Sequence, residues 1–383
     1  MNSDSPVSLR ISTYRYSSLV YLRNNRPVLW SLRVDAAADI EGAVVRIAVS
    51  PDYGAEQRIP LPYLRAGDSY DWRGECPAFD EERLMQLREE EAGHICVEVL
   101  DKDGAVLARQ EDEFKWLAYN SWAGGYEYPE LLAALTLPND PAVDRILEDT
   151  QARMQRTQPW QGYNENADAV RRCLTALWDT LAAQNINYAL PPASWRDTGV
   201  GQRVRTPSFI LEQRQSTCLD STLLLVACTA RMGYNPFVIL IDGHAFLGIM
   251  TENRHLPSPQ MTPAATVRNL LKQGKLLVLE TTTLNKDETH EPLSFEVAVA
   301  TGAQELFRLS DGDYFQALDI RKLWQECGIR PILGGDLVDV APAPPARDED
   351  ELITEQPRTR MDNWQLKLLD LSLRNNLLNT RTD

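Results

Sequence analysis

The sequence has no long apolar run, and no window reaches the ~18 consecutive apolar residues that a membrane-spanning helix needs. Residues 1–6 carry neither the basic stretch nor the apolar stretch that together mark a secretory signal peptide. These absences argue against a membrane-spanning or secreted protein. We therefore expect a cytoplasmic protein with no membrane partner.

Clustered positive charge is also lacking. The chain has 39 Lys and Arg residues against 55 Asp and Glu residues, a formal net charge of -16 at pH 7, and no basic run stands out. Proteins that bind nucleic acids present a basic face to the phosphates. Direct nucleic-acid binding is therefore not expected, and the acidic excess indicates a solvated surface.

The six cysteines form no Cys-x-x-Cys pair, and the four histidines complete no metal-ligand spacing with them. Disulfides are rare in the cytoplasm, so the cysteines are expected to be free thiols, most of them buried. We expect neither a metal nor a cofactor. The cysteines are Cys76, Cys96, Cys173, Cys218, Cys228 and Cys327.

A chain of 383 residues is too long for one ordinary domain, and its 43% apolar content is enough for a sizeable core. Residues 1–118 contain short period-two apolar segments separated by turns, which favour an immunoglobulin-like β-sandwich. From residue 129, after a linker rich in aromatics and glycine, the periodicity is helical, and helices and strands then alternate. We therefore predict the α+β fold class, with residues 119–338 forming a second domain.

Two further segments are predicted after the second domain. Residues 339–360 are rich in proline and acidic residues, a composition typical of a flexible linker. Residues 361–383 carry the periodicity of an amphipathic helix, which would dock on a partner or start a further domain. The alternative for this helix is packing on its own chain.

Three blocks in the second domain carry candidate catalytic residues. Cys218 opens an apolar helix, His244 begins an apolar strand, and Glu280 ends another strand. Thr217 is the expected N-cap of the helix, with Asp220 as its partner in a capping box. Cys218 would then lie at the first helical position, where the positive end of the helix dipole favours a thiolate.

The order of these blocks fits a nucleophile, a base and an orienting group. One helix, one strand and a turn separate Cys218 from His244, so the second strand can return toward the start of the helix. Glu280 ends the next strand and can lie beside His244, where it would fix the tautomer of the imidazole. Asp242 competes for this role, although its position favours the turn before His244.

An acyl-transfer site also needs hydrogen-bond donors for the developing oxyanion. The backbone N–H of Cys218 is one candidate, and a side chain from Gln202 or Gln215 is another. We favour Gln202, since it lies in a loop just before the nucleophile. The alternative is that this polar loop makes only structural hydrogen bonds.

Each residue alone also has a structural explanation. A cysteine at a helix start is usually a small buried side chain, and a histidine in an apolar strand is usually a satisfied core or turn residue. His255 and His290 lie in polar segments, where we expect exposure to solvent. What favours a catalytic site is the occurrence of Cys218, His244 and Glu280 together, in this order and in compatible elements.

The blocks 217–220, 243–246 and 280–281 resemble the motifs of the transglutaminase-like (papain-like) cysteine protease superfamily. In that superfamily the third motif is usually an aspartate followed by proline and threonine, whereas this chain has a glutamate followed by threonine. The resemblance implies a transglutaminase-like domain that acts on a peptide or isopeptide amide, as a hydrolase or an acyltransferase. The triad that it implies is Cys218, His244 and Glu280.

More narrowly, the blocks 201–205, 278–282 and 364–379 resemble the N-terminal region of a family of very large bacterial proteins. In that family the last block opens a domain of unknown function that leads into a superfamily 1 helicase motor, often with a Vsr-like endonuclease domain at the far end. These proteins resemble components of bacterial defence against phage. The resemblance implies that the chain is the N-terminal part or a subunit of such a protein, with a helicase or nuclease partner reached through the C-terminal helix.

A second hypothesis comes from a different functional class. Here the chain is a catalytically inactive scaffold, which keeps the transglutaminase-like fold for protein–protein assembly in a helicase or nuclease defence complex. The acidic surface, the predicted sandwich and the C-terminal helix suit this hypothesis. Substitution of the candidate nucleophile would distinguish the two hypotheses.

Overall fold

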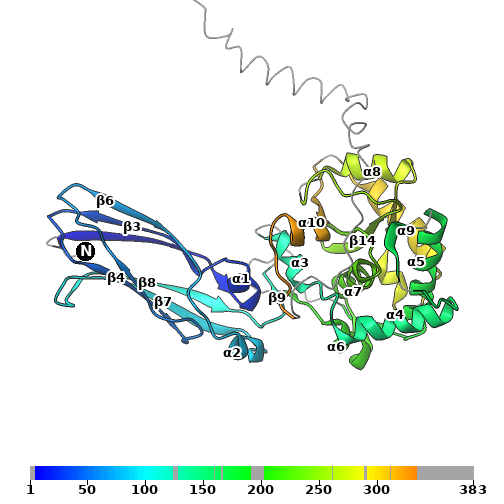
Figure 1. The fold of residues 1–383 in the computed structure, drawn as a ribbon, viewed down its shortest axis with the longest axis horizontal. Helices are drawn as coiled ribbons and strands as arrows, with labels where there is room; N and C mark the ends of the chain where they lie inside the picture. The colour runs from blue at the N-terminus through cyan, green and yellow to red at the C-terminus, as the bar shows by residue number, and fades with distance from the viewer. Residues whose placement is uncertain are drawn as a thin grey trace, which may run out of the picture. The chain divides into compact units, whose positions relative to one another are not determined.

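The computed structural model of the chain combines helices and strands throughout, a mixed α+β architecture (Figure 1). The chain divides into two units, residues 1–343 and 344–383, and every described residue belongs to the first. The linker predicted at 339–360 and the helix predicted at 361–383 lie outside the described residues, and the predicted domain boundary after residue 118 stays a prediction. The described residues are 5–123, 128–158, 160–164, 167–190, 202–260, 262–288, 291–310 and 312–333.

Two β-sheets build the first part of the fold, and Figure 1 shows them running alongside each other with the short helices α1 (Leu19–Arg23) and α2 (Glu81–Gln86) at one end. The strand orders are β1-β3-β6 and β2-β8-β7-β4-β5. Neighbouring strands are antiparallel except β2 and β8, which pair in parallel. The strands are β1 (Val7–Thr13), β2 (Tyr16–Ser17), β3 (Leu29–Ala36), β4 (Val44–Ser50), β5 (Gln57–Pro60), β6 (Ser69–Arg73), β7 (Glu91–Leu100) and β8 (Val106–Trp116).

Alternate residues of these strands face a shared apolar core. In β7, Ile95, Val97 and Val99 are buried in the same apolar cluster as Leu32 and Val34 of β3. Successive side chains of a strand point to opposite faces, so the period-two pattern of the sequence produces this one-sided burial. The β-rich character predicted for this segment is thereby confirmed.

A four-stranded antiparallel sheet, in the order β15-β14-β13-β16, and surrounding helices build the second part. Helix α7 (Cys218–Arg231) packs between this sheet and helix α4, and all its residues from Cys218 to Ala230 are buried (Figure 1). The strands are β9 (Ser121–Trp122), β10 (Asn187–Tyr188), β11 (Gln202–Arg203), β12 (Gln215–Ser216), β13 (Pro236–Ile241), β14 (His244–Met250), β15 (Leu276–Leu279) and β16 (Phe315–Asp319). The helices are η1 (Pro129–Leu131), α3 (Leu132–Leu135), α4 (Pro141–Arg153), η2 (Gly162–Asn164), α5 (Ala167–Ala182), α6 (Pro207–Gln213), α8 (Ala264–Lys272), η4 (Thr281–Leu284), α9 (Phe295–Arg308) and α10 (Ile320–Gln325).

The structure corrects three local predictions in this part. The helical period predicts one helix from 141 to about 158, but α4 ends at Arg153 because Gln155 takes a positive φ of 53°. The proline-containing stretch 251–267 is predicted as a loop, yet α8 begins within it, directly after a proline that takes the N-cap position. The sequence analysis does not predict strand β16, which is defined by its pairing with β13.

The end of the described chain returns to α1. The Asn24 side chain donates to the Arg330 carbonyl (3.2 Å) and accepts from the Arg330 backbone N–H (2.7 Å). Arg23 donates to the Ile332 carbonyl (3.0 Å), and the Trp324 ring N–H donates to the Ala133 carbonyl (2.8 Å). The bonds of Arg23 and Asn24 join the C-terminal end of α1 to residues 330–332, and the bond of Trp324 joins α10 to α3.

A glycine opposite a phenylalanine sets the packing of β13 on β14. Gly248 pairs in register with Phe237, and the Phe237 ring covers the glycine so closely that an added Cβ would lie 2.1 Å from ring carbon Cε2. Gly93 and Phe114 make the same kind of pair between β7 and β8. Both glycines therefore leave room for an aromatic ring on the neighbouring strand.

We expect Gly248→Ala to lower the free energy of unfolding by about 1–3 kcal/mol, because the buried Phe237 ring must leave its position. Urea unfolding followed by circular dichroism measures the change. Gly54→Ala is the control, since its added Cβ would meet its nearest neighbour, Pro77, at an ordinary 3.4 Å. Equal midpoints for the two variants would contradict this account of the packing.

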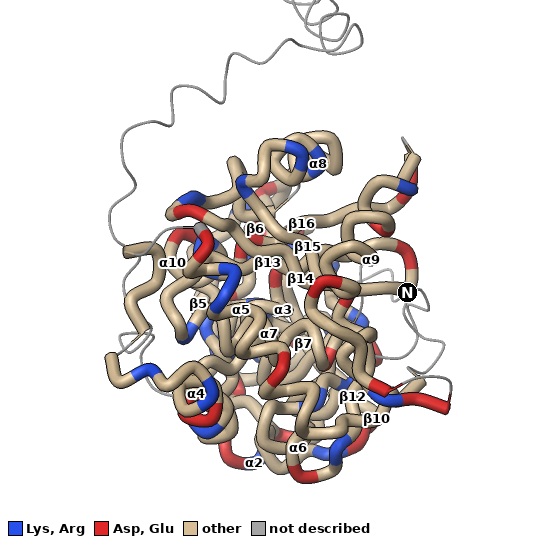
Figure 2. The backbone as a smooth tube through the Cα atoms, turned by 90° about the vertical axis from the view of Figure 1, so that its right-hand side faces the viewer, with Lys and Arg blue, Asp and Glu red and all other residues tan. Residues whose placement is uncertain are grey.

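Charges of both signs are spread over the described backbone. Figure 2 shows Lys and Arg interspersed with Asp and Glu. Among the described residues, no helix is both long and apolar enough to cross a membrane.

Candidate active site

Cys218 is the first residue of α7, as the sequence predicts. Thr217 is the N-cap: its hydroxyl accepts from the Asp220 backbone N–H (3.2 Å), while the Asp220 carboxylate accepts from the Thr217 N–H (2.9 Å). The predicted capping box is therefore confirmed. It places the Cys218 side chain at the helix end where the dipole favours negative charge.

Asp220 also joins the loop before the nucleophile to α7. Its buried carboxylate accepts from the backbone N–H of Arg205 (2.8 Å) and forms an ion pair with the Arg205 guanidinium (2.8 Å). The sequence predicts only the capping role of Asp220. The ion pair adds a charged connection between the segment that follows Gln202 and the first turn of the helix.

His244 and Glu280 meet at the ends of adjacent strands. His244 is the first residue of β14 and follows a turn in which Gly243 has a φ of 71°. Glu280 directly follows β15, the antiparallel neighbour of β14. The His244 Nε2 atom lies 2.7 Å from Glu280 Oε2, as the order of the elements predicts.

The second carboxylate oxygen of Glu280 is held by the residues after it. Oε1 accepts from the Thr282 backbone N–H (3.0 Å) and from the Thr282 hydroxyl (2.7 Å). These bonds fix the carboxylate plane, since both oxygens have partners. Glu280 thereby presents one oxygen to the imidazole in a set direction.

Burial and two partners govern the charge of His244. Burial alone would lower its pKa, but hydrogen bonds with Cys218 and Glu280 outweigh it and raise the pKa from 6.5 to about 10. Burial acts on Glu280 in the opposite direction and would raise its pKa, yet its bonds to His244 and Thr282 lower it overall. The pair therefore favours an imidazolium at His244 and a carboxylate at Glu280.

The imidazole of His244 has two partners. Its Nε2 atom faces Glu280, and Cys218 also raises the pKa of the ring. The structure thus brings the three predicted residues into one chain of contacts, in the order thiol, imidazole and carboxylate. Cys218 itself is 1% exposed, so the sulfur lies beneath its neighbours.

The side-chain amide of Gln202 is the candidate donor to the oxyanion. It lies in β11, which pairs with β9, and only 2% of it is exposed. Its Nε2 atom is buried and has no hydrogen-bond partner among the residues that the structure describes. Gln215, the alternative donor, is exposed in β12. The oxyanion role of Gln202 stays a prediction.

Tyr188 is a contact of the thiol that the sequence did not reveal. It lies in β10, in register with Ser216 of β12, and its hydroxyl hydrogen-bonds with Cys218. Burial, and then the charges of Cys218 and Glu280, raise the pKa of Tyr188 to about 12, so the hydroxyl stays protonated. No local motif marks Tyr188, because only the pairing of β10 with β12 brings it to the site.

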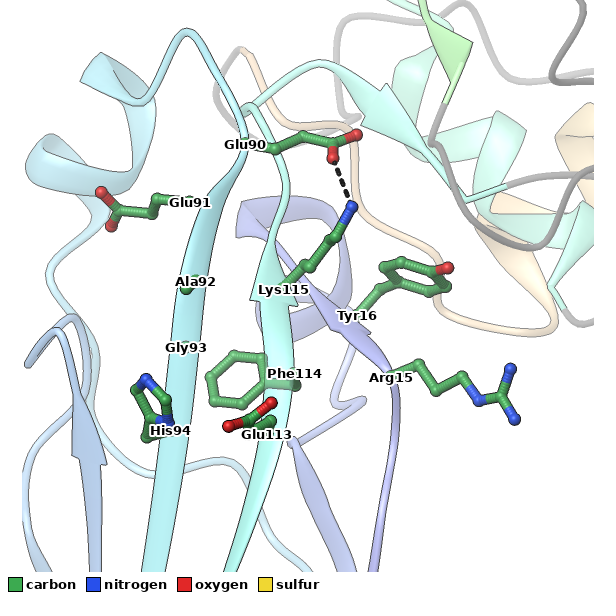
Figure 3. Close-up of a pocket in the computed structure, with 10 residues that line it drawn as sticks. All are labelled: Arg15, Tyr16, Glu90, Glu91, Ala92, Gly93, His94, Glu113, Phe114 and Lys115. Atoms are coloured by element: carbon green, nitrogen blue, oxygen red, sulfur yellow. Dashed lines mark hydrogen bonds and ion pairs between the residues drawn. The ribbon is translucent and has the colours of Figure 1, made fainter.

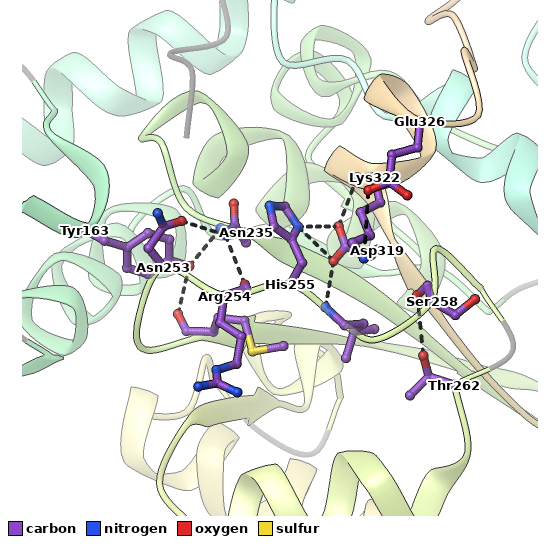
Figure 4. Close-up of polar contacts among 12 residues, drawn as sticks. Tyr163, Asn235, Asn253, Arg254, His255, Ser258, Thr262, Asp319, Lys322 and Glu326 are labelled. Carbon is purple, nitrogen blue, oxygen red and sulfur yellow. Dashed lines mark hydrogen bonds and ion pairs between the residues drawn. The ribbon is translucent and has the colours of Figure 1, made fainter. Parts of the chain in front are cut away.

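His255 corrects a prediction of solvent exposure. Its side chain is only 21% exposed, and Nδ1 lies 3.0 Å from the buried carboxylate of Asp319, which also accepts from the backbone N–H groups of Leu256 and Lys322 (Figure 4). The carboxylate anchors the loop after β14 to the start of α10. His290 lies outside the described residues.

A surface cavity of about 480 Å³ lies elsewhere, between β2, β7 and β8, and contains an ion pair between Lys115 and Glu90 (Figure 3). It contains none of the candidate catalytic residues. Within the described ranges, no group of His, Cys, Asp and Glu side chains is arranged to hold a metal ion.

Comparisons with known proteins do not assign this chain to a family: no protein-family model matches it, and no curated protein matches its sequence.

Proposed function

We propose that the chain is a cysteine-dependent hydrolase or acyltransferase that acts on a peptide or isopeptide amide. The observation that carries the proposal is the His244 imidazole held between two groups. Its Nε2 lies 2.7 Å from Glu280, and Cys218 at the first position of α7 is the second group that raises its pKa. A thiol, a base and an orienting carboxylate in this order are the parts of nucleophilic acyl transfer.

In the proposed reaction the Cys218 thiolate attacks the amide carbonyl carbon, and the carbonyl oxygen takes the negative charge. The backbone N–H of Cys218 and the Gln202 side chain donate to this oxyanion. The intermediate collapses to a thioester as the imidazolium of His244 gives its proton to the leaving amine. Water or a second amine then attacks the thioester, His244 takes the proton from it, and the thiolate is released.

We also propose the finer identities that the resemblance implies. The two sheets of residues 7–116 form an immunoglobulin-like sandwich, and the part built around α7 forms a transglutaminase-like domain. The order of Cys218, His244 and Glu280 supports the second identity. In this proposal the chain works as the N-terminal part or a subunit of a cytoplasmic anti-phage protein, next to a helicase or nuclease partner.

Alkylation tests whether the thiol is activated. We expect iodoacetamide to modify Cys218 at pH 7 faster than Cys173 and Cys228, which are matched controls because all three thiols are buried. His244→Ala is expected to slow the reaction of Cys218 about 10²-fold, since the imidazolium no longer favours the thiolate. Peptide mapping by mass spectrometry measures each rate. Equal rates for the three cysteines, unchanged in His244→Ala, would rule out an activated thiol.

One observation favours the scaffold hypothesis as the alternative, namely the 1% exposure of Cys218, which leaves little room for a substrate carbonyl in this conformation. Cys218→Ala in a phage-defence assay of the intact protein separates the two functions. Loss of defence with unchanged folding supports the enzyme. Retained defence supports the scaffold.

A further inference from the structure

We propose that Thr222 is a positioning residue, whose single buried hydroxyl holds the three chain segments that carry Cys218, His244 and Glu280. The inference rests on the proposed function, because it assigns a role within that same site. The hydrogen bonds of Thr222 in the described part of the chain go to neighbours of the sulfur, the imidazole and the carboxylate. It acts through the backbone and side chains next to them.

The contacts of Thr222 come from all three segments. Its Oγ1 atom lies 2.8 Å from the Cys218 carbonyl oxygen, one helical turn earlier in α7. The same atom lies 3.2 Å from the carbonyl oxygen of Ala245, the residue after His244. It also lies 2.9 Å from the hydroxyl of Thr281, the residue after Glu280.

The hydroxyls of Thr222 and Thr281 act as a pair, because together they have only two protons to donate. Thr222 and Thr281 have one hydroxyl proton each, and the Thr281 hydroxyl also reaches the Cys218 carbonyl at 3.3 Å. Two protons therefore serve two carbonyls and the contact between the hydroxyls. Without the Thr222 hydroxyl, the Ala245 carbonyl loses this donor, and Thr281 keeps only its long bond to Cys218.

Burial raises the free-energy cost of breaking the hydrogen bonds of Thr222 and Thr281. Thr222 and Thr281 are each 0% exposed, so solvent cannot replace a lost partner without opening the core. A buried polar group that loses its partner costs free energy, which favours one arrangement of the three segments over others. Catalytic geometry is sensitive to displacements below one ångström, and these bonds connect the elements that set it.

Helix α7 itself offers a matched control. Thr229 is also a fully buried threonine, but among the described residues its hydroxyl bonds to carbonyls of its own helix alone, Leu225 (2.7 Å) and Val226 (3.1 Å). Thr229→Val removes the same group in the same helix without touching the triad segments. Valine keeps the shape of threonine in both variants.

The experiment compares Thr222→Val, Thr222→Ser and Thr229→Val in the full chain. We expect Thr222→Val to slow alkylation of Cys218 about 10-fold or more at pH 7 and to change its pH profile. Thr222→Ser is expected to restore both, because it keeps the hydroxyl. Thr229→Val should leave both unchanged. If Thr222→Val fails to fold, Thr281→Val removes the other hydroxyl of the pair and is expected to act in the same direction.

A titration of the His244 ring by NMR gives a readout that does not need reactivity. Thr222→Val is expected to lower the pKa of His244 toward its ordinary value, as its contacts with Cys218 and Glu280 loosen. Unchanged titration and unchanged alkylation in Thr222→Val would overturn the positioning role. The two proposals can fail separately. If Cys218, Cys173 and Cys228 were alkylated equally fast in the wild type, the proposed function would be wrong. If Thr222→Val still shifted the titration of His244, the positioning role would stand.

Discussion

Asp220→Ala is expected to lower the free energy of unfolding by about 3 kcal/mol, one of the largest effects of any single substitution in the second part. The change removes the capping box of α7 and leaves the Arg205 guanidinium without its carboxylate. Breaking a buried ion pair costs about 3–5 kcal/mol. We expect the lower end, because the Arg205 side chain is 28% exposed and can turn toward solvent.

Asp80→Ala serves as a control that separates the stability lost with an N-cap from the stability lost with the ion pair between Asp220 and Arg205. Asp80 is the exposed N-cap of α2, and its side chain accepts from the Arg83 backbone N–H (3.0 Å). Its loss should cost about 1 kcal/mol, the usual value for an N-cap. Urea midpoints of the two variants give the comparison. Similar losses would mean that the ion pair of Asp220 contributes nothing to stability.

Glu280→Gln is expected to remove much of the pH dependence of stability between pH 6.5 and pH 9. The folded-state pKa of His244, about 10, lies above its ordinary value of 6.5, so the folded protein holds this proton more tightly than the unfolded chain. The resulting stability is fully present below about pH 6.5 and is lost as the pH rises toward 10. Glutamine keeps the size of the side chain but removes the charge that favours the imidazolium.

The expected loss in Glu280→Gln is on the order of 2 kcal/mol at pH 6, since one pKa unit corresponds to about 1.4 kcal/mol and Cys218 shares the shift. The loss should shrink by pH 9. Ionisation of cysteines in the unfolded chain also lowers stability above pH 8, but it affects both proteins equally and cancels in the difference.

Urea unfolding at several pH values measures this difference. Glu148→Gln, on the exposed face of α4, is the control for removing one negative charge. The free energy of unfolding of this control should differ from that of the wild type by the same amount at every pH. If the difference for Glu280→Gln were also independent of pH, Glu280 would not be the group that holds the proton on His244.

Local signals in the sequence were sufficient for the elements around Cys218. The capping box, which joins residues three apart, determines where α7 begins. The turn at Asp242 and Gly243, which follows a buried strand, determines where β14 begins. Such signals depend on bonds between near neighbours, so a single sequence contains them. The contact between His244 and Glu280 followed from the order of two adjacent strands.

Contacts between distant segments could not be predicted in the same way. Tyr188 reaches Cys218 only because β10 pairs with β12. His255 is covered because Asp319 lies on a strand that the sequence did not indicate. Thr222 looks like any small residue of a buried helix until the neighbours from β14 and η4 are in place. These positions depend on tertiary packing, which local periodicity does not encode.

The bonds between Asn24 and Arg330 have a consequence for how the protein matures. The two residues are 306 positions apart, so a ribosome completes almost the whole described chain before Asn24 finds this partner. Until then water takes the place of Arg330 at the Asn24 amide, whose other bond is to the Val20 carbonyl. The segment at the end of α1 is therefore expected to gain its full protection from proteases only when residues 329–332 emerge.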